Sequence, residues 1–108
     1  MTARIAVLAS GRGSNLQAIL DAIAAGTLPA ALVGVFSDRP AAAALLRVPE
    51  AQRWAAAPSA FSDRPAYEAA LADAVAATAP DWIVCAGYMR ILGPAFVARF
   101  AGRLINIH

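Results

Sequence analysis

RIAVLASGRGSN, residues 4–15, places a glycine-containing loop directly after a short apolar segment. Residues 4–10 form a nearly continuous apolar run with β-branched side chains, which is typical of a strand buried on both faces of a parallel sheet. After the loop, apolar residues follow the i, i+3, i+4, i+7 spacing of an amphipathic helix, at Leu16, Ile19, Leu20 and Ile23. The stretch therefore predicts a strand, a tight loop and a helix that packs back onto the sheet.

The loop itself has the composition of an anion site. A strand–loop–helix turn presents bare backbone N–H groups and the positive end of the helix dipole to an anion. Gly11 and Gly13 allow a tight turn and the close approach of a phosphate, and Ser14 and Asn15 add side-chain donors. Because residue 16 is leucine, the loop is not the G-x-G-x-x-G dinucleotide motif, and it also lacks the G-K-[ST] of a Walker loop. A single phosphate monoester is favoured, with a turn that binds no ligand as the alternative.

The remaining elements alternate along the chain. Further strands are expected at 31–37, 81–87 and 103–108, with 53–58 as an ambiguous edge strand. Local signals bound the helices: Ser14 or Asn15 as a cap and Gly26 as an end, then 41–47, then Asp63 and Pro65 opening a helix that Ala79-Pro80 stops, then 94–100. The expected buried side chains of the last two helices are Tyr67, Leu71 and Val75, and Phe96, Val97 and Phe100. This order predicts one α/β domain over 1–108, a doubly wound, mostly parallel open sheet of the Rossmann-like kind.

The last strand ends on polar residues at alternate positions. Asn106 and His108 should share one face, while Ile105 and Ile107 point into the core. If strands 4–10, 81–87 and 103–108 are neighbours, their carboxyl ends bring together the glycine loop, the segment 87–92 and Asn106 with His108. The alternative for Asn106 and His108 is a turn cap and an ordinary strand-end residue.

Composition excludes several classes of function. All nine basic residues are arginine, they are scattered, and the net charge is only +2, so a nucleic-acid surface is not expected. No stretch approaches the 18 apolar residues of a membrane span, and we expect a cytoplasmic protein. The single Cys85 lies in an apolar run and is expected to be a small core residue.

Asp38 follows the second strand, where its side chain can hold a ribose or cap the next helix. The helix cap is the favoured interpretation.

Four segments together resemble the phosphoribosylglycinamide (GAR) formyltransferase family, the folate-dependent enzymes of purine synthesis: SGRGSNLQAI (10–19), FSDRPAY (61–67), CAGYMRILGPAFV (85–97) and GRLINIH (102–108). The resemblance implies transfer of a formyl group from 10-formyltetrahydrofolate to the amine of phosphoribosylglycinamide. It implies no metal. Tyr88 stands where phenylalanine is common, a change that should preserve packing.

The resemblance also implies roles for matching residues. The glycinamide substrate would be bound by Gly11, Arg12, Gly13, Ser14, Asn15 and Gly87. The folate would be held by Arg64, Met89, Arg90, Ile91, Leu92 and Asn106, with backbone groups of 89–92 reading the edge of the pteridine ring. Asn106 and His108 would be catalytic. The chemistry agrees, because an amide can hold the oxyanion of a tetrahedral intermediate and an imidazole can donate a proton near neutral pH.

Family members continue beyond the residue that matches His108, and that part supplies an aspartate to the catalytic histidine. We therefore expect this chain to be the N-terminal half of the enzyme, with the sheet truncated after its fifth strand and little activity alone. Its expected partners are the missing half and small-molecule substrates, with a homodimer also considered. Alternatives are another formyl-folate enzyme (a formyltetrahydrofolate hydrolase or methionyl-tRNA formyltransferase) or a non-catalytic nucleotide-phosphate binding module. An NAD-binding domain is disfavoured by Leu16.

Overall fold

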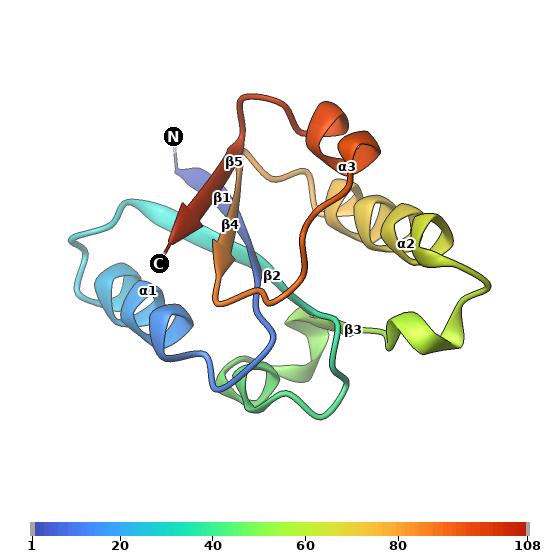
Figure 1. Ribbon diagram of the computed structural model, residues 1–108. Helices are drawn as coiled ribbons and strands as arrows, with labels where there is room; N and C mark the ends of the chain where they lie inside the picture. Colours follow the sequence, from blue (N-terminus) through green and yellow to red (C-terminus); the bar gives the residue numbers. More distant parts are fainter. Residues whose placement is uncertain (1, 108) are drawn as a thin grey trace.

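A computed structural model describes residues 2–107 as a five-stranded sheet flanked by helices (Figure 1). The sheet order is β3-β2-β1-β4-β5, and all four pairings are parallel. The strands are β1 (Ala3–Leu8), β2 (Ala30–Ser37), β3 (Arg53–Ala55), β4 (Trp82–Ala86) and β5 (Leu104–Ile107). The predicted fold class is confirmed, and so is the expectation that the first, fourth and fifth strands are neighbours. Successive strands are added to one side of β1 up to β3 and to its other side from β4 onward, so the strand order reverses between β1 and β4, the position where open parallel sheets place ligands.

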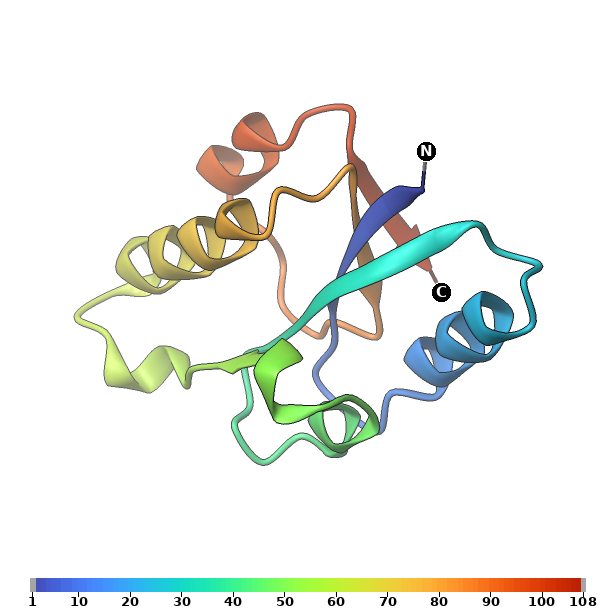
Figure 2. The same ribbon diagram turned by 180° about the vertical axis from the view of Figure 1, so that it is seen from behind.

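The helices lie on both faces of the sheet. Helix α1 (Ser14–Ala24) covers one face, and α2 (Arg64–Ala77) and α3 (Pro94–Arg99) cover the other (Figures 1 and 2). Three short 3₁₀ segments complete the chain: η1 (Ala43–Arg47), η2 (Glu50–Gln52) and η3 (Pro58–Ala60). Alternate β1 residues divide between the two cores, with Val7 packed beside Leu16 of α1 and Leu8 packed beside Leu71 of α2. Strand β1 is thus buried on both faces, which confirms the prediction made from its apolar run.

Several local predictions are confirmed. Asp63 caps α2 by accepting a hydrogen bond from the Ala66 amide at 2.8 Å. Tyr67, Leu71 and Val75 are fully buried, as their spacing predicted. Near the end of α1, Gly26 has a φ of +78°, the left-handed conformation typical of the residue after a helix.

Other predictions are wrong. Neither Ser14 nor Asn15 caps α1, because Gly13 occupies the cap position and no side chain accepts there. Val97 of α3 is 44% exposed, and Ile105 of β5 is 42% exposed. Ile105 shares its face with the partly buried Ile107, but β5 is the edge strand, so alternation gives the direction of the side chain without giving it a cover. None of the helices within residues 2–107 is long and apolar enough to cross a bilayer.

Candidate functional site

The glycine loop and the loop after β4 meet at the carboxyl edge of the sheet. The Ser10 amide donates to the Gly87 carbonyl at 3.1 Å, and the Met89 amide donates to Ser10 Oγ at 2.8 Å. Gly87 has a φ of +78°, and a Cβ there would meet nothing within 4 Å. The convergence predicted for these two loops is therefore confirmed, with open space beside Gly87 at their junction.

Protein contacts hold the glycine loop from one side. The Gly11 carbonyl accepts from the Ala44 amide at 3.0 Å, and the Arg12 carbonyl accepts from Arg47 Nε at 2.7 Å. Helix α1 then begins at Ser14 without a side-chain cap and without an acidic residue in its first turn. Its first backbone N–H groups thus have no intrahelical partner, which is the arrangement that binds anions.

Gly13 is required by packing as well as by its backbone. Its φ is +81°, and a Cβ would lie 2.8 Å from Ala44 Cβ and 2.9 Å from Ala44 Cα. The sequence suggested that this glycine admits a phosphate; the structure shows that it admits the η1 segment. Gly11 differs, because nothing lies within 4 Å of the Cβ position there.

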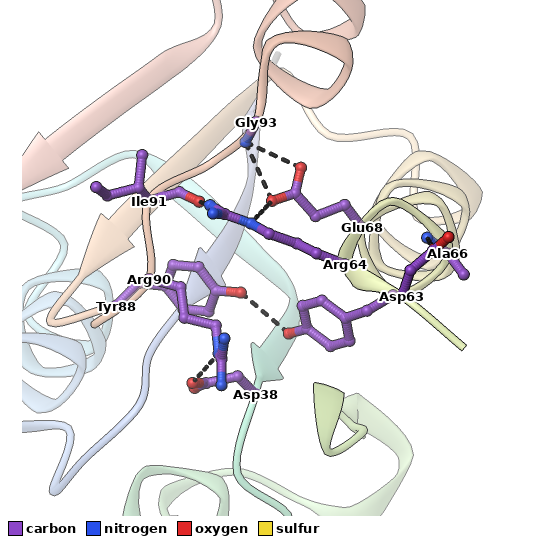
Figure 3. A network of polar contacts seen from close by, with 10 residues as sticks. Asp38, Asp63, Arg64, Ala66, Glu68, Tyr88, Arg90, Ile91 and Gly93 are labelled. Carbon is purple, nitrogen blue, oxygen red and sulfur yellow. Dashed lines mark hydrogen bonds and ion pairs between the residues drawn. The ribbon is translucent and has the colours of Figure 1, made fainter. Parts of the chain in front are cut away.

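A buried polar network joins the carboxyl ends of β1 and β2 to the segment 88–92. Figure 3 shows its Asp38–Arg90 part. Ser10 Oγ donates to Asp38 Oδ1 at 2.6 Å, and Arg90 Nε donates to Asp38 Oδ2 at 3.0 Å. Ser10 and Asp38 are buried, whereas the Arg90 side chain is about half exposed. The predicted helix cap at Asp38 is wrong, because the end of β2 brings its carboxylate to Ser10 and Arg90. Sequence reasoning missed Ser10 and the true partners of Asp38.

A second anchor comes from the start of α2. Glu68 accepts from the Gly93 amide through both carboxylate oxygens, at 2.9 and 3.1 Å, and Arg64 Nε lies 3.2 Å from Glu68 Oε2 (Figure 3). Arg64 also donates through Nη2 to the Ile91 carbonyl. These contacts fix the far end of the segment 88–93. Glu68 carries no motif signal, since its role depends on a partner 25 residues away.

Two cavities lie on either side of this segment. The first, the β4–β5 cavity, has a volume of about 400 Å³ and is lined by Cys85, Tyr88, Arg90, Ile91, Leu92, Val97, Leu104, Ile105 and Asn106. The second, the α2–α3 groove, has a volume of about 560 Å³ and contains Arg64 together with Ile91 and Leu92.

The predicted folate residues divide between these places. Arg90, Ile91, Leu92 and Asn106 line the β4–β5 cavity, whereas Arg64 lines the α2–α3 groove. Met89 is 74% exposed and lines neither cavity, and its amide donates to Ser10 Oγ. The predicted folate contact of Met89 therefore stays a prediction.

Asn106 reaches the cavity from β5. It is exposed, and it pairs in the parallel ladder with Cys85, whose side chain packs in the core on the α2 side of the sheet. His108 lies outside the described residues, so its predicted position beside Asn106 stays a prediction. Burial raises the pKa of the Cys85 thiol, which favours the neutral form and fits the predicted role as a core residue. Within residues 2–107, no three histidine, cysteine, aspartate or glutamate side chains gather as metal ligands.

Tyr88 and Tyr67 share a hydrogen bond behind the cavity, with 3.0 Å between their phenolic oxygens. Burial, more than any charge nearby, raises the pKa of both phenols. Since the folded pKa values lie above the usual value of about 10, stability is retained below pH 10 and is lost as the pH rises above it.

We expect Tyr88→Phe to lower the free energy of unfolding by about 1 kcal/mol, because the buried Tyr67 hydroxyl loses its partner. Urea unfolding at pH 7 measures this difference. Repeating the measurement between pH 9 and 11 should show a shallower alkaline loss in the variant, and an unchanged pH dependence would contradict the assignment.

The sequence matches a known protein family along almost its whole length. The family model described as formyl transferase matches residues 3–108. This chain belongs to the formyl transferase family. It is 46% identical over 106 residues to the phosphoribosylglycinamide formyltransferase of Escherichia coli K12, covering 96% of this chain and 50% of that protein.

Solved structures of family members agree. The glycinamide ribonucleotide transformylase 1 of Symbiobacterium toebii superposes with a TM-score of 0.92 at 40% identity, covering 99% of this chain and 51% of that one. A formyltetrahydrofolate deformylase from Pseudomonas putida superposes with a TM-score of 0.86 at 24% identity, over 38% of its length, and shows the shared fold alone. The chain thus spans about half the length of these Escherichia coli and Symbiobacterium toebii relatives.

Proposed function

We propose that this protein takes part in the transfer of a formyl group from 10-formyltetrahydrofolate to the amine of phosphoribosylglycinamide. One observation carries the proposal: the glycine loop and the segment 87–92 meet at one sheet edge beside the Asn106 cavity. The same chain is 46% identical to a phosphoribosylglycinamide formyltransferase. We further propose that residues 1–108 act as one domain of that enzyme.

The glycine loop is the proposed phosphate site. Gly11 and Arg12 have their carbonyls directed to η1, which leaves the first-turn amides of α1 for an anion. Ser14 and Asn15 can add side-chain donors, and the exposed Arg12 adds positive charge. Open space lies beside Gly87, where the two loops meet, and it can admit the glycinamide part of the substrate.

The β4–β5 cavity fits a flat heteroaromatic ring. Its walls are largely apolar, and they include exposed Ile91, Val97 and Ile105. Among the described residues, the amides of Ile91 and Leu92 have no protein partner, so they can pair with the edge of a ring. The folate would supply the formyl group, and Arg64, which lines the α2–α3 groove with Ile91, would hold a more distant part of the same molecule.

The catalytic proposal rests on Asn106 and His108. The Asn106 amide is a neutral donor at the mouth of the cavity, where it can stabilise the negative oxygen that develops on the formyl carbon. His108, two residues further along, can accept or donate the proton that the attacking amine must lose. Neither residue forms a covalent bond in this scheme.

A formyl-transfer assay on the native gene product, after its intact mass is measured, tests the proposal. We expect formylation of phosphoribosylglycinamide that depends on 10-formyltetrahydrofolate. Release of formate without an acceptor would instead assign a hydrolase, and formylation of methionyl-tRNA would assign that transferase. Phosphate binding without any of these reactions would leave a non-catalytic binding module and would remove the roles given to Asn106 and His108.

A further inference from the structure

Within residues 2–107, Asp38 is the one buried carboxylate, and the proposed mechanism does not use it. Its side chain is only 5% exposed, although it sits at the end of β2, where a side chain can easily reach solvent. Burying a carboxylate is unfavourable unless it is paired and hydrogen-bonded, and both of its oxygens are engaged. The partners are Ser10 and Arg90, one from each of the two loops that meet at the site.

The network gives the Ser10 hydroxyl a defined direction. Ser10 Oγ donates a hydrogen bond to Asp38 Oδ1, with 2.6 Å between the two oxygens. A lone pair of Ser10 Oγ therefore remains to accept from the Met89 amide at 2.8 Å. The chain of contacts therefore runs from the Asp38 carboxylate, through one hydroxyl, to the backbone of the segment 88–92.

The second oxygen of Asp38 acts on Arg90. Asp38 Oδ2 accepts a hydrogen bond from Arg90 Nε. The terminal nitrogens make no hydrogen bond within residues 2–107, and Arg90 is one of the residues that line the β4–β5 cavity. Asp38 consequently fixes the segment at two adjacent residues, one through the backbone and one through the side chain.

We propose that Asp38 is a positioning residue, which acts through Ser10 and Arg90 to hold the segment 88–92 as the wall of the β4–β5 cavity. It thereby sets the affinity for the ligand of that cavity, while the phosphate-binding part of the glycine loop keeps its own contacts to η1 through the Gly11 and Arg12 carbonyls. The identity of this ligand as the formyl folate rests on the proposed function. Glu68 fixes the Gly93 end of the segment independently, so the two anchors can be separated by experiment.

Steady-state kinetics of the native gene product test this role. For Asp38→Ala we expect the KM for 10-formyltetrahydrofolate to rise about tenfold or more, since a charge-assisted network is lost. The KM for phosphoribosylglycinamide and the kcat should stay within about threefold. Asp38→Asn keeps one acceptor oxygen, so its KM for the folate should lie between those of the unmutated protein and Asp38→Ala. The matched control is Asp73→Ala, which breaks an exposed aspartate–arginine pair at 2.7 Å and should leave both KM values unchanged. Equal changes in both KM values for Asp38→Ala, or none, would overturn the proposal.

Backbone hydrogen exchange provides a readout that does not depend on turnover. In Asp38→Ala and in Ser10→Ala, the Met89 amide should exchange about tenfold faster or more, while the Gly93 amide, held by Glu68, keeps its protection. Unchanged exchange at Met89, or equal acceleration at Gly93, would overturn the positioning role. Absence of formyl transfer in the unmutated protein would refute the proposed function alone, since the exchange result still decides the role of Asp38.

Discussion

Gly13→Ala is expected to lower the free energy of unfolding by about 3 kcal/mol, a sum of two separate costs. A left-handed backbone costs an L-residue about 1–2 kcal/mol, and Gly13 has a φ of +81°. The new methyl would also lie 2.8 Å from Ala44 Cβ and 2.9 Å from the backbone of Ala44, and such overpacking typically costs another ~1–3 kcal/mol. Urea denaturation followed by circular dichroism measures the total.

Two other glycines separate these costs. Gly26→Ala places the same methyl at a φ of +78° in open space, so it should cost only the backbone term of about 1–2 kcal/mol. Gly11→Ala has neither a positive φ nor a neighbour within 4 Å, so its effect should be close to zero. If Gly13→Ala destabilises the protein no more than Gly26→Ala, the close approach of η1 to the loop is not a constraint.

Asn106→Ala is expected to reduce the kcat of formyl transfer by about 10²- to 10³-fold, the loss typical of removing one oxyanion donor. The side chain lies on β5 at the β4–β5 cavity and is exposed, so its removal should leave the stability nearly unchanged. The measurement is kcat and KM for both substrates with the native gene product, alongside thermal unfolding of the same samples.

Asn106→Asp is the sharper variant, because it keeps the shape of the side chain and removes its N–H donors. We expect it to be at least as impaired as Asn106→Ala, since a carboxylate would repel the developing negative charge. Ile105→Ala, which trims the adjacent cavity residue, is the control and should raise the KM for the folate more than it lowers kcat. An Asn106→Asp variant that keeps its kcat within threefold would rule out the oxyanion role.

His108→Ala should abolish formyl transfer while phosphate binding persists.

Local sequence signals determined most of the framework. The apolar run before Gly11, the periodicity from Leu16 onward and the capping residue Asp63 act over a few residues. Such signals act within one turn or one strand, so they can be read without knowing the partner segments. The parallel order of the strands followed from them, because each strand is separated from the next by a connection that crosses back over the sheet.

The partners within the site were decided only by the tertiary structure. Asp38 finds Ser10 at a separation of 28 residues and Arg90 at a separation of 52, and nothing near Asp38 in the sequence distinguishes this pairing from a helix cap. The reason why residue 13 must be glycine is likewise Ala44, which reaches it from η1. Hydrogen-bond partners of buried polar groups depend on which loops meet, and local pattern does not contain that information.

Exposure was also decided at this level. Strand alternation gave Ile105 a direction, but the position of β5 at the sheet edge left it uncovered. The family resemblance implied a folate contact for Met89, and the tertiary structure shows that its amide donates to Ser10 while its side chain is exposed. The sequence by itself therefore determined the elements, their order and the edge at which the site lies. Packing between distant segments decided which side chains enter the site, because burial is a property of the surfaces that cover a residue as much as of the residue itself.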